Sequence, residues 1–190
     1  MVYVGSKSRL APIFVPMFNN LIKDLNINTY IEPFVGGANI FDKIICENKY
    51  GYDKSKTLIA LFNQGLNDID VIPEEGSRAW FDKAKAEYKG EIPQTLEDWE
   101  IGAIQFFASF GTRGFPGGYA NNKHNRDYYN ERYINFKKQI KLLKQTGGVF
   151  INKSYMDIEV PDSSLIYCDP PYTGTTPYGY AFENDFNHSD

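Results

Sequence analysis

Residues 164–172, Ser-Leu-Ile-Tyr-Cys-Asp-Pro-Pro-Tyr, combine residue types that could do chemistry. Residues 165–167 are apolar and β-favouring, so they predict a short buried strand. Pro170 and Pro171 must end that strand, because proline has no N–H to donate to a sheet and a fixed φ. The pattern therefore predicts that Asp169 lies at the carboxyl end of a strand, which is the edge where open α/β sheets bind ligands.

This arrangement suits chemistry on a planar amine. The carboxylate of Asp169 and the carbonyl of Pro170 can both accept hydrogen bonds from one NH₂ group. Two such acceptors draw the nitrogen lone pair out of conjugation with its ring and toward an electrophile, while Tyr172 offers a face for stacking. The alternative is a strand end followed by a Pro-Pro turn with a surface tyrosine, and four residues alone do not decide between the two.

A second group of residues could hold a nucleotide-like cofactor. Residues 29–31 predict a strand, Gly36 and Gly37 predict a turn that admits close backbone approach, and residues 38–45 predict a helix. A strand, a glycine turn and a helix in this order form the usual cradle for such cofactors. A glycine pair by itself is a weak signal.

Two charged side chains could complete that cradle. Asp53 ends a strand predicted at about residues 49–52, where it could bind ribose hydroxyls or cap the helix predicted at about residues 55–66. Lys7 follows a Gly-Ser turn before an amphipathic helix predicted at residues 9–25. Exposed N–H groups and a lysine there would suit a carboxylate, although a plain helix cap is the alternative.

In this order the motifs resemble those of the Dam-type DNA adenine N6-methyltransferases, which use S-adenosylmethionine. Asp-Pro-Pro-Tyr at 169–172 resembles their catalytic motif, and Glu-Pro-Phe-Val-Gly-Gly at 32–37 resembles their glycine motif. The likeness covers residues 1 to about 65 and 145 to 186, and more loosely 106–119. It implies catalytic roles for Asp169, Pro170 and Tyr172. It implies contacts to S-adenosylmethionine from Tyr3, Lys7, Phe34, Gly36, Gly37, Asp53 and Asp169.

The resemblance also implies a fold, an α/β methyltransferase with a Rossmann-like sheet and a helical insert. Residues 1–66 and 146–190 would form the catalytic and cofactor domain, and residues 67–145 the target-recognition insert. A third strand is predicted at residues 147–151, and Ser154 follows where relatives usually carry an acid that reads the cofactor's adenine.

Relatives also continue past the catalytic motif to a seven-stranded sheet. We therefore expect an incomplete sheet here, whose open edge is covered in an oligomer or by a missing carboxyl-terminal segment.

The insert is predicted to bind DNA. Helices are predicted at residues 73–88, 96–110 and 128–143, with a glycine-rich segment at 111–126. Residues 111–145 hold eight basic and two acidic side chains, a local net charge of +6 on a chain whose net charge is −4. Such a patch is an electrostatic footprint for phosphates, although a solvated helix face and a surface loop are the alternatives. The residues best suited to contact DNA are Arg113, Tyr119, Lys123 and Arg126.

Composition narrows the remaining classes of protein. The 190 residues, 42% of them hydrophobic, suffice for one domain with a sizeable core. Cys46 and Cys168 form no disulfide framework or zinc spacing, which predicts a reducing cytoplasm. The amino-terminal residues read as neither a signal peptide nor a membrane span, so we expect no membrane partner. His124 has no metal-binding cluster around it in the sequence, and we expect no metal.

We therefore expect a site-specific methyltransferase that moves a methyl group from S-adenosylmethionine to N6 of adenine in double-stranded DNA. Because N6 is buried in a duplex, the target base must be flipped out. Two alternatives remain open. The same fold could act on cytosine N4 or on RNA, or the chain could be a truncated protein that binds DNA or cofactor without catalysis.

Overall fold

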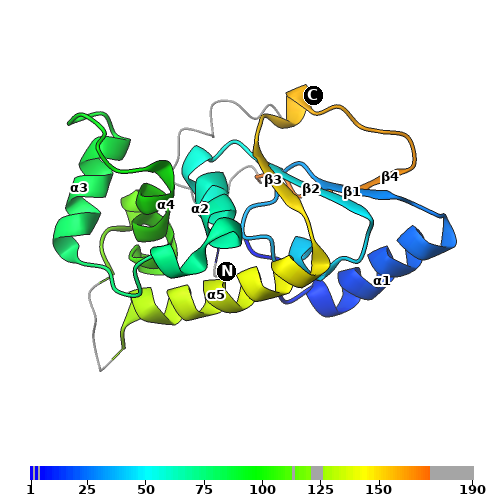
Figure 1. Ribbon diagram of the computed structural model, residues 1–190, viewed down its shortest axis with the longest axis horizontal. Coiled ribbons are helices and arrows are strands. Elements are labelled where there is room, and N and C mark those ends of the chain that lie inside the picture. Colours follow the sequence, from blue (N-terminus) through cyan, green and yellow to red (C-terminus); the bar gives the residue numbers. More distant parts are fainter. Residues whose placement is uncertain (2, 4, 113, 121–125, 172–190) are drawn as a thin grey trace.

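The computed structural model describes residues 1, 3, 5–112, 114–120 and 126–171. Four parallel strands form one sheet in the order β3-β2-β1-β4. The α3 and α4 helices group at one end of the molecule, the sheet and α1 lie at the other, and α5 runs between them (Figure 1). The strands are β1 (Thr29–Glu32), β2 (Asn48–Asp53), β3 (Val149–Asn152) and β4 (Ser164–Ile166). The helices are α1 (Ala11–Asp24), α2 (Lys56–Asn67), α3 (Arg78–Tyr88), α4 (Asp98–Phe107) and α5 (Tyr128–Thr146).

The strand β1 lies between β2 and β4, and all four of its residues are buried. Its Ile31 stands in register with Tyr50 of β2 and Ile166 of β4. Because the strands are parallel, their carboxyl ends meet at one edge of the sheet. The α/β class and the four strands are as predicted from the sequence.

The helix predicted at residues 38–45 is wrong. The described structure has only a 3-10 turn there, η1 (Phe41–Lys43). Gly36 and Ala38 both have positive φ, 46° and 53°, which breaks the helical path. The carbonyls of Gly37 and Ala38 instead accept hydrogen bonds from Gln139 Nε2 on α5, at 2.9 and 3.1 Å.

The other predicted helices exist with shifted ends. The helix expected at 73–88 begins only at α3, where the Ser77 hydroxyl caps it by accepting from Trp80 N at 3.1 Å. The helix expected at 96–110 ends at Phe107, where the chain turns. The glycine-rich segment contains two 3-10 turns, η3 (Phe110–Thr112) and η4 (Phe115–Gly117), and two more, η2 (Ile69–Val71) and η5 (Tyr155–Asp157), lie elsewhere.

The predicted burial of the catalytic strand is wrong in part. Ile166 of β4 is 40% exposed, because β4 has a strand, β1, on only one side within the described sheet. The expectation that another chain or a further segment covers this edge stays a prediction.

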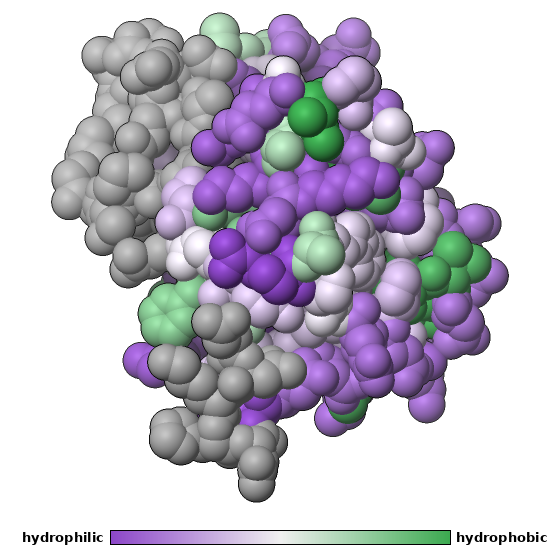
Figure 2. Space-filling view, turned by 90° about the vertical axis from the view of Figure 1, so that its left-hand side faces the viewer, coloured by the Kyte–Doolittle hydropathy of each residue, from purple (hydrophilic) through white to green (hydrophobic). Residues whose placement is uncertain are grey.

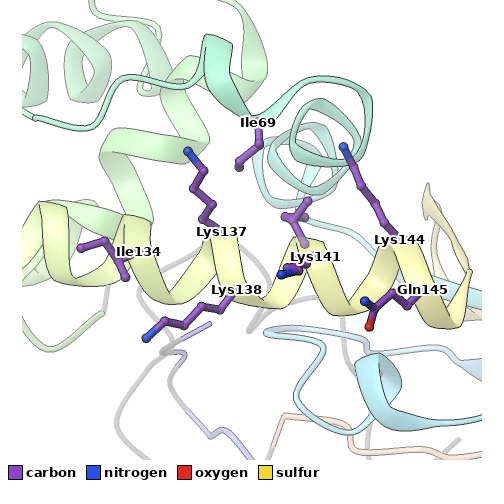
Figure 3. Close-up of a pocket in the computed structure, with 8 residues that line it drawn as sticks. Ile69, Ile134, Lys137, Lys138, Lys141, Lys144 and Gln145 are labelled. Atoms are coloured by element: carbon purple, nitrogen blue, oxygen red, sulfur yellow. The ribbon is translucent and has the colours of Figure 1, made fainter.

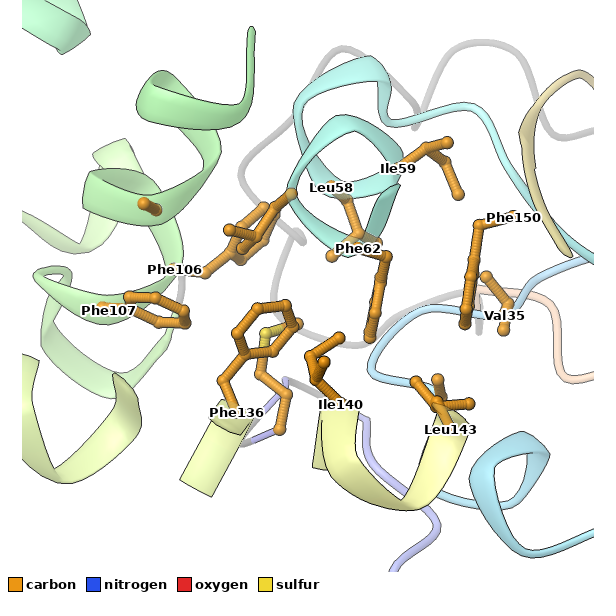
Figure 4. Close-up of a cluster of buried hydrophobic side chains, with 14 of the residues drawn as sticks. Val35, Leu58, Ile59, Phe62, Phe106, Phe107, Phe136, Ile140, Leu143 and Phe150 are labelled. Carbon is orange, nitrogen blue, oxygen red and sulfur yellow. The ribbon is translucent and has the colours of Figure 1, made fainter. Parts of the chain in front are cut away.

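Aromatic side chains dominate the core (Figure 4). Phe62 of α2 stacks on Phe150 of β3 with ring centroids 4.4 Å apart, and Phe136 of α5 lies 5.4 Å from both Phe62 and Phe107 of α4. A single cluster of buried side chains thus connects the sheet with the helices of residues 67–145. Phe81, Phe106 and Phe107 are buried as predicted, whereas Trp80 and Trp99 are half-buried. The division into two domains stays a prediction.

In the described part of the chain, no helix combines the length and apolar character needed to cross a membrane.

The contact between α2 and α4 generates a stability prediction. A Cβ on Gly102 of α4 would lie 2.2 Å from the carbonyl oxygen of Thr57 on α2. We expect Gly102→Ala to lower the free energy of unfolding by about 1–3 kcal/mol, despite the better helix propensity of alanine. Urea denaturation measures the change.

Gly65→Ala on α2 is the matched control. A Cβ there meets the side-chain ends of Ile140 and Phe136 at 2.9 Å, which can shift, whereas the Thr57 backbone cannot. Equal losses for the two variants would contradict the close backbone contact at Gly102.

Candidate active site

The glycine turn follows β1 directly and is covered by Tyr3. Val35 N–H donates to the carbonyl of Tyr52 at 2.8 Å, which ties the turn to the end of β2. A Cβ on Gly37 would lie 2.6 Å from Cβ of Tyr3, and one on Gly36 would lie 3.0 Å from its ring. With the positive φ of Gly36 added, this turn requires glycine.

Asp53 fixes the turn from the end of β2. Its carboxylate accepts hydrogen bonds from Gly36 N–H at 3.1 Å and from Ser55 N–H at 2.8 Å. Burial raises the pKa of this carboxyl, and the two N–H donors act in the opposite direction. The helix cap of α2 is Ser55, whose hydroxyl accepts from Leu58 N at 3.4 Å, so the alternative that Asp53 caps α2 is wrong.

Lys7 and Asp169 form a two-pronged ion pair. Lys7 Nζ lies 2.7 Å from Oδ1 and 2.6 Å from Oδ2 of Asp169, and it also donates to the carbonyl of Gly5 at 3.0 Å. The two side chains are 19% and 17% exposed. An ammonium group therefore occupies the acceptors that sequence analysis predicts for an amine. No local sequence pattern predicts this contact, because the two residues come from opposite ends of the chain.

Aromatic rings flank the turn on two sides. Phe34 lies beside Tyr155, with ring centroids 5.1 Å apart, and Tyr3 lies beside Phe106 of α4 at 5.9 Å. All but Phe106 are half-buried. The helical region therefore contributes a wall to this site.

Sequence analysis missed Gln139. It lies on the buried face of α5, is 5% exposed, and joins the turn carbonyls to Asp42 Oδ2 at 3.0 Å. Its signal was available, since a glutamine between Phe136 and Ile140 interrupts an apolar helix face. Buried polar side chains require such partners.

Buried ionisable groups lie below the turn. Tyr30 donates its hydroxyl hydrogen to Glu32 Oε1 at 2.7 Å, and both side chains are buried. Burial raises the pKa of Glu32 to about 8 and lowers that of Lys49 to about 8, with Asp42 nearby. Burial therefore favours the neutral form of Glu32 in this interior.

Several of the basic residues predicted to bind phosphate make contacts with other residues of this chain. Arg126 pairs with Glu131, with Nη2 2.6 Å from Oε2, and Lys137 pairs with Asp70 at 2.8 Å. Arg132 donates to backbone carbonyls. Of the predicted site residues, Tyr172, Arg113 and Lys123 lie outside the described residues. Tyr119 is half-buried, 5.5 Å from the ring of Phe81.

A groove of about 590 Å³ lies elsewhere, on the outer side of α5 (Figure 3). Its floor is apolar and its rim carries lysines, but none of its residues comes from the strand ends or the glycine turn. The lining residues are Ile69, Ile134, Lys137, Lys138, Ile140, Lys141, Lys144 and Gln145. We assign the chemistry to the sheet edge, because that is where the acceptors and the turn converge.

Within residues that the structure describes, no three His, Cys, Asp or Glu side chains gather to hold a metal ion. Both cysteines are free.

Comparison with known proteins gives two findings. A model of the D12 class N6 adenine-specific DNA methyltransferases matches residues 3–190. The chain is also similar to the Type II methyltransferase M.MjaIII of Methanocaldococcus jannaschii. The two are 26% identical over an alignment of 223 positions, which spans 99% of this chain and 74% of the relative.

The Lys7–Asp169 pair generates a second prediction. In a double-mutant cycle with Lys7→Met and Asp169→Asn, we expect a coupling free energy of about 1 kcal/mol or more, because the pair is two-pronged and mostly shielded from water. Denaturation without cofactor measures it. The control cycle uses Arg126 and Glu131, which are 57% and 44% exposed and should couple more weakly. A coupling at Lys7–Asp169 no larger than in the control would contradict the pair.

Proposed function

Because this chain belongs to the D12 class N6 adenine-specific DNA methyltransferases, we propose that it methylates adenine N6 at specific sites in duplex DNA from the sheet edge that carries Asp169. The observation that carries this assignment to the edge is the convergence there of Asp169, Lys7, the glycine turn and Asp53. Because adenine in DNA is the substrate of this family, the alternatives that the chain methylates cytosine N4 or RNA are disfavoured.

The residues around the turn fit S-adenosylmethionine. Each oxygen of Asp53 accepts one N–H, so the carboxylate retains lone pairs for ribose hydroxyls. The Lys7 ammonium, with three donors, suits the carboxylate of the amino-acid part. Tyr3 and Phe34 supply apolar walls beside Gly36 and Gly37. When bound, S-adenosylmethionine supplies an electrophilic methyl group on a positively charged sulfur.

Asp169 and Pro170 would orient the target amine. The Asp169 carboxylate and the Pro170 carbonyl each accept one amine hydrogen, which directs the nitrogen lone pair away from the ring. Each oxygen of Asp169 accepts one N–H from Lys7 and retains a second lone pair, so the amine can bind beside the ammonium. Catalysis is then mainly positioning.

Flipping the adenine out of the duplex costs a few kcal/mol of stacking and pairing. We propose that stacking on Tyr172 offsets part of that cost. We further propose DNA contacts for Tyr119 and Arg126, and for Arg113 and Lys123, and a cytoplasmic location.

Asp169 provides the direct test of catalysis. We expect Asp169→Asn to lower the rate of methyl transfer by about a hundredfold or more, because an amide NH₂ faces the amine with donors in place of one acceptor. Transfer of a radiolabelled methyl group to duplex DNA, followed by nucleoside analysis, measures it. Asp157→Asn, on the exposed η5 turn, is the control. A rate for Asp169→Asn within a few-fold of the native protein would refute the catalytic role of Asp169, whereas a native protein that transfers no methyl group would favour the non-catalytic alternative.

Cofactor affinity is tested separately. Lys7→Ala and Asp53→Ala should each weaken S-adenosylmethionine binding about ten- to a hundredfold, since a charge-assisted hydrogen bond contributes roughly 1.5–3 kcal/mol. Titration calorimetry measures the affinities, with Lys56→Ala, whose side chain is 69% exposed on α2, as control. Unchanged affinity in both variants would place the cofactor elsewhere.

A further inference from the structure

Arg132 of α5 closes the end of α4. The last carbonyls of a helix lack partners within it and need donors from elsewhere. Arg132 Nη1 donates to the carbonyls of Phe107 and Ser109 at 2.8 and 2.6 Å. The guanidinium also lies over the ring of Tyr128, 5.8 Å from its centroid. This cation is therefore directed at the protein backbone.

The segment that follows these two carbonyls folds back on itself. Phe110 N–H donates to the carbonyl of Gly118 at 2.8 Å, and Ala120 N–H donates to the carbonyl of Ala108 at 2.7 Å. Gly114 N–H donates to the hydroxyl of Ser109 at 3.0 Å. We call the described residues 109–112 and 114–120 the clasp.

Two aromatic side chains of the clasp pack against rings of α3. Phe115 is 2% exposed and lies 5.3 Å from the rings of both Phe81 and Tyr88 of α3. Tyr119 packs on Phe81 as well, and its backbone pairs with Ser109. Two rings of the clasp thus face the core, and its backbone is closed by hydrogen bonds.

Phe110 is the exception, because its side chain is 65% exposed. It lies three residues beyond the end of α4, and Phe106 in the last turn of α4 contacts the Tyr3 ring that covers the glycine turn. The face of the molecule at the α3 and α4 end is mostly hydrophilic, with isolated apolar residues (Figure 2). A single exposed ring is ordinary on a protein surface, but this one sits on a hydrogen-bonded backbone that follows the helix whose Phe106 contacts Tyr3.

We propose that Arg132 is a positioning residue for DNA binding, which holds the clasp so that Phe110 stacks on a DNA base beside the active site. The inference rests on the proposed function. Preorganising a contact lowers the entropy lost on binding, and stacking of a base on an aromatic ring contributes about 1–3 kcal/mol. Arg132 would then affect DNA binding without touching a phosphate.

Salt dependence separates positioning from direct contact. Affinity for DNA falls as the salt concentration rises. Each lost phosphate contact makes the negative slope of log affinity against log salt shallower by about 0.9. We expect Arg132→Gln to weaken DNA binding about tenfold at every salt concentration with an unchanged slope, because the backbone carbonyls lose charge-assisted donors. Arg132→Lys should restore part of the affinity. Arg126→Gln is the comparison: it also removes one positive charge, but from an exposed side chain, and it should make the salt slope shallower.

The measurements are fluorescence anisotropy with duplex DNA from 50 to about 200 mM salt, the range over which phosphate contacts show most clearly, together with methyl transfer, cofactor affinity and thermal unfolding. If the salt slope becomes shallower by the same amount in Arg132→Gln and in Arg126→Gln, Arg132 is a phosphate contact and the proposal is overturned. Unchanged DNA affinity in Arg132→Gln would overturn it too.

Phe110→Ala keeps the test open if Arg132→Gln does not fold, since the Phe110 ring is mostly outside the core. We expect this variant to bind DNA about tenfold more weakly with an unchanged salt slope and unchanged cofactor affinity. Native affinity for DNA in Phe110→Ala would overturn the proposal while native methyl transfer leaves the proposed function standing. A native protein that neither binds nor methylates DNA would overturn both.

Discussion

The parallel pairing of β1 with both β2 and β4 is the constraint on which the rest of the structure depends. It places the carboxyl ends of three strands at one edge, so the glycine turn, Asp53 and Asp169 meet although they are far apart in the chain. The hydrogen bond from Gly36 N–H to Asp53 then fixes the turn against β2. Lys7 reaches Asp169 across the same edge. A slip of one residue in either pairing would face these groups away from one another.

The helical region supports this edge and is more than an appended recognition module. Gln139 of α5 holds the carbonyls of the glycine turn, and Phe106 of α4 contacts Tyr3 above it. The aromatic core continues from β3 through α2 into α4 and α5. Changes in the helices that we propose to contact DNA can therefore reach the glycine turn through packed side chains, since close-packed cores transmit small displacements.

Local sequence patterns predicted the strands, most of the helices and the Asp-Pro-Pro-Tyr motif. They did not predict contacts between residues that are distant in the chain. Short apolar runs identified the strands, and helical spacing identified α1 and α5, because these signals are local. The helix expected at 38–45 failed because left-handed residues and Gln139 overrode its propensity. The charge count over 111–145 already included Glu131, the partner of Arg126, but it left out the pairing of Lys137 with Asp70 and the donation of Arg132 to backbone carbonyls. A sequence count assigns no partners to the charges it sums.

Hydrogen exchange read by mass spectrometry, with and without S-adenosylhomocysteine, tests the central claim most directly. The account predicts slower exchange in peptides covering residues 34–39 and 53–55, where Gly36 and Ser55 N–H groups bond to Asp53. Peptides covering residues 140–145, which lie beside the groove on α5 and exclude Gln139, should exchange at unchanged rates. Protection confined to the α5 groove, with none at the glycine turn, would contradict the placement of the cofactor at the carboxyl edge of the sheet.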